Sequence, residues 1–107
     1  MPTINSWNVT QTQEWASTSL QGYVTGKYSE LVRVLGQPCM SSDTRWPLRL
    51  QHATTGETVI VTIYDYDTAP GACKRGEYEW HIGGFNRRAF EVLKDILRNG
   101  FTDWQEV

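Results

Sequence analysis

Residues 80–90 read WHIGGFNRRAF, and within this stretch a strand pattern gives way to a helix pattern. Up to Ile82, apolar and polar residues alternate along the chain: Tyr78, Trp80 and Ile82 against Glu77, Glu79 and His81. From Ala89 onward, apolar residues recur at helical spacing: Ala89, Phe90, Leu93, Ile96 and Leu97. A period of two followed by a period of 3.6 predicts a strand and then an amphipathic helix, with Asn86 as the helix N-cap.

Two arginines fall in the first turn of this predicted helix. The macrodipole already makes that end positive, so Arg87 and Arg88 are unfavourable there unless something negative lies among them. Gly83 and Gly84 come just before, and glycines let a ligand approach the backbone closely. Free amides, Asn86 and two guanidinium groups together predict a phosphate-binding corner. In the alternative interpretation, the glycines only turn the chain, and the arginines lie in water or pair with Glu91 and Asp95.

Other residues suit a nucleotide ligand. Arg45 and Arg49 lie on the face of their predicted strand opposite its apolar residues, so they are available if helices do not cover that face. Tyr66 and Trp80 offer aromatic faces for a base, and His81 shares the polar face of its strand. The alternative for Trp80 is a place in the core. No motif fixes a catalytic geometry, so we predict no enzyme, no cofactor and no metal site.

The remaining pattern predicts an α+β fold. We expect strands and helices as follows: a strand over 19–25, a helix over 27–35 ended by Gly36 and Pro38, a polar loop over 39–44, a hairpin over 45–66, a loop over 67–76 and a tail after residue 100. Pro47 favours an edge position or a late start for its strand. Residues 1–18 form an arm or a first strand, and 19–107 a single domain. The prediction is an antiparallel sheet of four to five strands with two helices packed on it.

Composition narrows the classes of function. The chain has 107 residues, with 12 Asp and Glu against 10 Lys and Arg and a net charge of −2, which argues against a nucleic acid polymer as partner. It has no apolar run of about 18 residues, so we expect no membrane span. Cys39 and Cys73 have no neighbouring histidine cluster, which argues against zinc. We expect a cytoplasmic protein.

Five sequence blocks follow one another along the chain: TSLQGYV, YSELVRVLGQP, RWPLRL, TVIVTIYDY and YEWHIGG. Over residues 18–97 they resemble a widespread group of small bacteriophage proteins. In that group a Y-x-x-L-V-x-x-x-G-x-P helix precedes a hairpin ending near T-I-Y-D-Y and a terminal W-H-I-G-G plus helix. The blocks also resemble the first type of Thoeris anti-defence protein.

The resemblance implies a specific function. Members of the Thoeris anti-defence family bind cyclic ADP-ribose signals of bacterial immunity as sponges, without chemistry, in pockets between subunits of an oligomer. For this chain it implies a homo-oligomer, dimer or higher, in the infected host cell, with Arg87 or Arg88 on the phosphates. The alternative is a bacteriophage protein that inhibits a host nuclease or defence complex by protein–protein contact.

Overall fold

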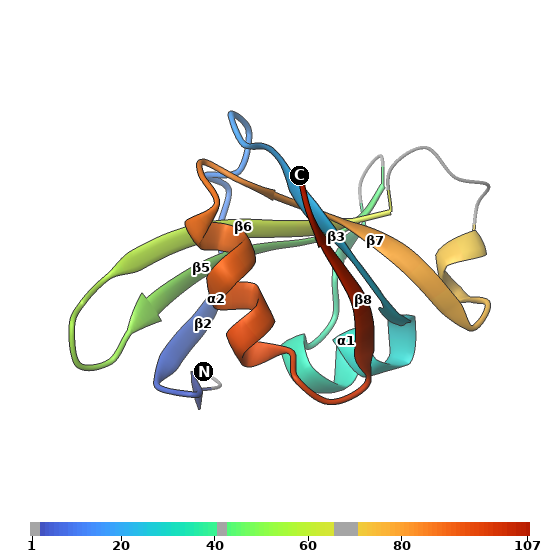
Figure 1. Ribbon diagram of the computed structural model, residues 1–107, viewed down its shortest axis with the longest axis horizontal. Helices are drawn as coiled ribbons and strands as arrows, with labels where there is room; N and C mark the ends of the chain where they lie inside the picture. Colours follow the sequence, from blue (N-terminus) through green and yellow to red (C-terminus); the bar gives the residue numbers. More distant parts are fainter. Residues whose placement is uncertain (1–2, 41–42, 66–70) are drawn as a thin grey trace.

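The computed structural model (Figure 1) describes residues 3–40, 43–65 and 71–107. Its elements follow this order: β1 (Thr3–Ile4), β2 (Trp7–Gln11), β3 (Ser19–Lys27), α1 (Tyr28–Leu35), β4 (Cys39–Met40), β5 (Thr44–His52), β6 (Thr58–Tyr64), the 3-10 turn η1 (Ala72–Lys74), β7 (Glu77–Gly84), α2 (Arg88–Ile96) and β8 (Phe101–Glu106). Two helices and an antiparallel sheet confirm the predicted α+β class.

One sheet contains all the strands of the described residues, in the order β1-β2-β5-β6-β7-β3-β8, with β4 paired to β5. Figure 1 shows both helices on one side of this sheet, which we call the inner face. The loop from β2 to β3 lies on the other side, the outer face, where Trp15 contacts Arg45. The two helices therefore pack on the inner face, whereas a short loop lies over the outer face.

The prediction of four to five strands is too low. Residues 39–40, expected in a loop, pair with β5, and the expected tail forms β8 along β3. Residues 3–11 supply β1 and β2, and β2 pairs with β5. β1 and β4 have two residues each and β8 is mostly polar, so their pairing depends on backbone hydrogen bonds rather than on a hydrophobic pattern. In β2, by contrast, Trp7 and Val9 alternate with polar residues and are buried.

Pro47 marks neither an edge strand nor a late strand start, because β5 begins at Thr44 and lies inside the sheet between β2 and β6. On the β2 side, however, pairing covers only Leu48 to His52, and β4 covers only Thr44 and Arg45. Pro47 falls between these two partners, where its missing N–H interrupts neither ladder. Its carbonyl still accepts a hydrogen bond from the Thr12 amide at 3.0 Å.

The core lies between the inner face and the helices. Trp46 and Trp80 are fully buried and meet edge to face, with ring centroids 5.4 Å apart. Their indole N–H groups donate to the carbonyls of Gly36 and Gly26, respectively. The expected stripe of α2 is buried against the sheet. Among the described residues, no helix is both long and apolar enough to cross a membrane.

Candidate functional site

The predicted phosphate corner, Gly83 to Arg88, is built differently from the expectation. Gly83 and Gly84 do not form a turn but continue β7, paired with Thr62 and Val61 of β6. A methyl group on Gly84 would overlap the Cβ of Ala89, and one on Gly83 would come within 2.7 Å of Thr62 Cγ2. Protein atoms therefore occupy the space that was expected to admit a ligand.

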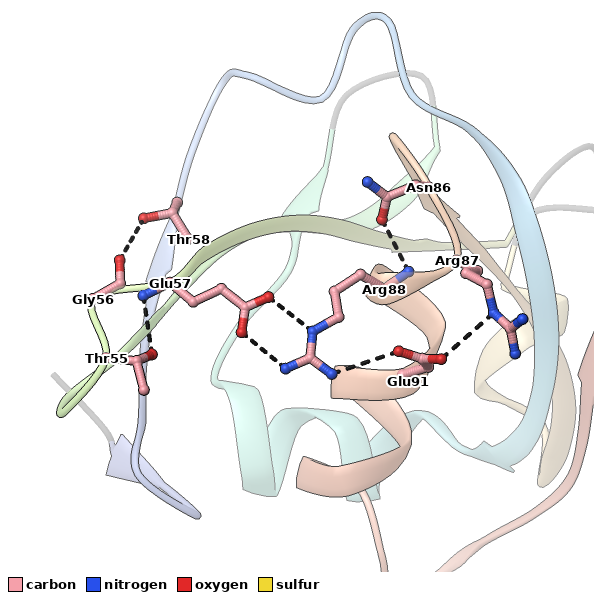
Figure 2. Close-up of polar contacts among 8 residues, drawn as sticks. All are labelled: Thr55, Gly56, Glu57, Thr58, Asn86, Arg87, Arg88 and Glu91. Atoms are coloured by element: carbon pink, nitrogen blue, oxygen red, sulfur yellow. Dashed lines mark hydrogen bonds and ion pairs between the residues drawn. The ribbon is translucent and has the colours of Figure 1, made fainter.

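The two arginines of this corner are paired with carboxylates (Figure 2). Arg88 donates through Nε and Nη2 to both oxygens of Glu57, each at 2.8 Å, and also contacts Glu91 at 3.5 Å. Arg87 Nε lies 3.0 Å from Glu106 and 3.4 Å from Glu91. The negative charge that the helix start requires is thus supplied by the protein itself. A phosphate here would have to displace these carboxylates.

Asn86 supports the helix start as expected of a capping side chain. Its Oδ1 accepts a hydrogen bond from the Arg88 amide at 2.9 Å, although the helix begins at Arg88, one residue later than a cap at Asn86 implies. A hollow of about 170 Å³ lies beside the corner, between Asn86 and the start of β6. It is smaller than typical small-molecule sites, which measure about 300–1,000 Å³.

The outer face brings other predicted residues together. Tyr23, His81, Tyr64 and Arg45 are successive cross-strand partners on β3, β7, β6 and β5. The rings of Tyr23 and His81 are 5.0 Å apart, and those of His81 and Tyr64 are 5.3 Å apart. The Arg45 guanidinium lies 4.4 Å from the Tyr64 ring centre. Trp15 completes this row, which we call the ring ladder.

Arg45 is the most constrained cation of the ladder. Its Cζ lies 4.0 Å from the Trp15 ring centre, so the guanidinium contacts two aromatic rings. Nε and Nη2 donate to the Asp43 carboxylate at 3.2 and 2.7 Å, and Nη1 donates to Thr62 Oγ1 at 2.9 Å. Its side chain is 13% exposed. Three of its five N–H groups are used, which leaves two for a ligand within the described part of the chain.

A hollow of about 200 Å³ opens next to this guanidinium, lined by Trp15, Ala16, Thr18, Arg45 and Tyr64. Aromatic faces and a fixed guanidinium are the groups that stack bases and bind phosphates. Arg49, the other predicted cation of β5, is exposed and lies 3.4 Å from Glu14. Tyr66 lies outside the described residues, and Trp80 belongs to the core on the opposite face.

Sequence reasoning missed Trp15 and Asp43 as neighbours of Arg45, and Tyr23 as a neighbour of His81. Trp15 is in a loop whose path over the sheet has no periodic signal. Tyr23 lies on the outer face because the inward positions of its strand are Gly22, Val24 and Gly26, and Phe90 and Phe101 fill the space beside the two glycines. The alternation of bulky and small residues along β3 is the signal that places Tyr23 on the outer face.

One titratable group in each region has a lowered pKa, and the physical cause differs between the two regions. At the corner, the hydrogen bonds from Arg88 lower the pKa of Glu57. In the ladder, burial lowers the pKa of His81, and the nearby charge of Glu79 opposes this effect. In the described ranges, no cluster of three or more His, Cys, Asp or Glu residues is arranged to hold a metal ion.

Comparison with models of known protein families, with curated proteins and with solved structures finds no match for this chain.

Proposed function

We propose that this chain is a bacteriophage anti-defence protein that binds and sequesters a cyclic nucleotide immune signal, of the cyclic ADP-ribose type, without cleaving it. The observation that carries the proposal is the Arg45 guanidinium in contact with the rings of Trp15 and Tyr64 on the outer face. The sequence blocks that resemble phage anti-defence proteins give the biological setting. The ring ladder gives a physical basis for recognising a base and a phosphate together.

Arg45 is prepared for an anion because its neighbours fix its orientation. Asp43 and Thr62 accept hydrogen bonds from the guanidinium, and the rings of Trp15 and Tyr64 contact it. A ligand therefore meets a donor group that has already lost its side-chain entropy, which reduces the cost of binding. The Asp43 carboxylate lowers the net charge, so a base stacked on Trp15 or Tyr64 must contribute to affinity alongside the phosphate.

The lining of the outer hollow favours binding over catalysis. It comprises Trp15, Ala16, Thr18, Arg45 and Tyr64, none of which is a carboxylate or an imidazole. Hydrolysis of a pyrophosphate or glycosidic bond normally uses a general base or a metal-activated water. Stacking and charge-assisted hydrogen bonds need neither.

The size of the hollow supports an oligomeric site. About 200 Å³ accommodates one base or one phosphate group, whereas whole-ligand sites measure about 300–1,000 Å³. A second subunit facing the outer face would enclose the rest of a cyclic dinucleotide-sized ligand. The proposed functional unit is therefore a homo-oligomer in which the ladders contribute to shared pockets.

Calorimetry with cyclic ADP-ribose isomers and cyclic di- and trinucleotides tests the proposal. Replacing Trp15 by Ala removes a stacking face and should weaken binding by about 1–3 kcal/mol, or roughly 5- to 150-fold in Kd. Arg45→Gln should weaken it as well. Arg49→Gln is the matched control, since it removes an exposed arginine of the same strand. Absence of heat with every ligand at micromolar protein would reject the function.

Recovery of the ligand separates sequestration from hydrolysis. The complex is heat-denatured, and the released nucleotide is analysed by mass spectrometry. A sponge returns the ligand intact and in stoichiometric amount, whereas products in excess of the protein would identify an enzyme.

The second candidate is inhibition of a host nuclease or defence complex by protein–protein contact. It is favoured by Phe85, which is 55% exposed beside the charged corner of α2. An exposed aromatic ring next to arginines is typical of interaction hot spots. A stoichiometric host protein that binds the wild-type chain but not Phe85→Ser, together with no nucleotide binding, would favour this candidate.

A further inference from the structure

A cleft of about 390 Å³ lies on the helical side of the molecule, away from the ring ladder. It forms where the β1–β2 turn meets the last turn of α1 and the residues that end α2. This volume falls within the range of small-molecule sites, about 300–1,000 Å³. It is also larger than the hollows beside Arg45 and Arg88.

The cleft has an apolar floor. Ile96 and Leu97 are buried at the end of α2, and Ile4 and Val34 are half-buried against the core. These four side chains come from three separate elements, so the floor depends on the complete fold. Burying a flat apolar body on such a floor gains about 25 cal/mol for each Å² removed from water.

The rim is cationic and adjustable. Arg33 and Arg98 line the cleft, and their side chains are 60% and 66% exposed. Arg33 contacts the Glu30 carboxylate on the same helix at 2.9 Å, and Arg98 contacts the Asp95 carboxylate at 2.7 Å and the Asp95 carbonyl at 3.0 Å. Exposed pairs of this kind contribute about 0–1 kcal/mol, so a ligand can recruit these guanidinium groups at little cost.

Helix C-termini normally repel anions, but this effect is compensated here. The Asp95 carbonyl accepts hydrogen bonds from Asn5 Nδ2 at 2.7 Å and from Arg98 Nε at 3.0 Å. At the end of α1, the Gly36 amide donates to the Val32 carbonyl at 2.8 Å. Arg33 in the last turn of α1 also offsets the negative end of that helix dipole, and Arg98 lies two residues beyond the end of α2. The carbonyls of Asp95 and Val32 are therefore hydrogen-bonded, and an anion at the rim of the cleft meets guanidinium groups instead.

We propose that this cleft binds a small amphipathic anion, with its apolar or aromatic body on the floor and its carboxylate, sulfonate or phosphate between Arg33 and Arg98. The site is distinct from the ring ladder and does not depend on the nucleotide-binding proposal. Both helices form its walls, so a ligand here also bridges α1 and α2.

The test uses 8-anilinonaphthalene-1-sulfonate, an aromatic sulfonate whose fluorescence rises in apolar surroundings, as the probe of the folded protein. We expect saturable binding with one probe per chain. The double variant Arg33→Gln/Arg98→Gln should weaken binding at least about tenfold, because two charge-assisted contacts are lost. Arg49→Gln, the matched exposed arginine of the outer face, should bind the probe like the wild type.

NMR shifts locate the probe. Binding should move the side-chain amide signals of Asn5 and Asn99 and the backbone amides of Ile96 and Leu97, all of which border the cleft. Equal affinity of the double variant and the wild type would overturn the proposal. Shifts centred on Trp15 and Ala16, or fluorescence that does not saturate, would also overturn it.

Discussion

At the scale of single residues, Arg88 shows how a cation is tolerated at the positive end of a helix. The sequence correctly indicated that something negative must accompany it, but the partner is Glu57 of the β5–β6 turn, 31 positions away. The pair ties that turn to the start of α2, as Figure 2 shows. No spacing rule links the two positions, because their proximity depends on the sheet.

Replacing Glu57 by Gln should lower the melting temperature by about 2–4 °C at pH 7. Since Arg88 lowers the pKa of Glu57 in the folded state, the carboxylate stabilises the fold above its unfolded pKa. That contribution is lost as the pH falls through the lower, folded pKa. The difference between wild type and variant should therefore be largest near neutrality and shrink in acid, as measured by calorimetric scans between pH 7 and pH 3.

Glu14→Gln is the matched control for this measurement, because it removes an exposed carboxylate that contacts its arginine, Arg49, through one atom at 3.4 Å and otherwise accepts from Thr12 Oγ1 at 3.1 Å. It should leave the melting temperature nearly unchanged. If both variants lose the same amount at every pH, the bidentate pair has no special role.

Gly84 is required because its α-hydrogen packs against Ala89. Gly84→Ala should destabilise the protein by about 1–3 kcal/mol through overpacking between β7 and α2. Adding Ala89→Gly should relieve the overlap, although a glycine inside the helix costs about 1 kcal/mol by itself. Urea denaturation of both single variants and the double variant measures the coupling. Strictly additive effects would show that the two methyl positions do not compete for space.

At the scale of elements, hydrophobic periodicity predicted the strands and helices that bury one regular face. The alternation in β7 and the stripe of α2 match the burial, and α1 starts at Tyr28, one residue from the expected start. β8 was missed because only Phe101 of its six residues is buried, so it has no alternating pattern. For the site, Arg45 and His81 were correctly placed on a polar strand face. Their alignment with Tyr64 required the cross-strand register, which single-strand patterns do not contain.

The ring ladder should make stability depend on pH through His81. Because burial lowers its folded pKa, the unfolded chain binds the proton more readily, and stability falls as the pH drops below about 6.5. His81→Phe should therefore lose less stability than wild type between pH 7 and pH 5 in urea titrations. Glu79→Gln should move the NMR titration of the His81 ring to lower pH, since Glu79 raises that pKa. An unchanged ring titration would contradict this assignment.

At the scale of the whole molecule, both ends of the sheet discourage further strand pairing. β1 has two residues, and β8 carries Asp103 at a φ of 52° with a register shift against β3. Short, acidic or irregular edges are typical protections against edge-to-edge association. The proposed oligomer is therefore expected to form through the outer face rather than by extension of the sheet.

The division into a core face and a binding face gives the final prediction, which compares two tryptophans. Trp46 is fully buried and donates to the Gly36 carbonyl, so Trp46→Ala should cost about 3–5 kcal/mol. That is a large share of the roughly 5–15 kcal/mol that stabilises a domain. Trp15 is half-buried in a loop, and Trp15→Ala loses a cation–π contact of about 0.5–1 kcal/mol. Urea titrations followed by circular dichroism measure both changes independently of tryptophan fluorescence.

Ligand binding should respond in the opposite sense for these two positions. Trp15→Ala should keep the fold and lose affinity for the ligand at the outer face. Trp46→Phe keeps a ring in the core, so it should lower the stability, while the molecules that stay folded should bind the ligand like the wild type. Equal destabilisation by Trp15→Ala and Trp46→Ala would mean that the loop over 12–18 belongs to the core. The outer face would then be a structural surface, and the case for a ligand between Trp15 and Tyr64 would fail on stability data alone.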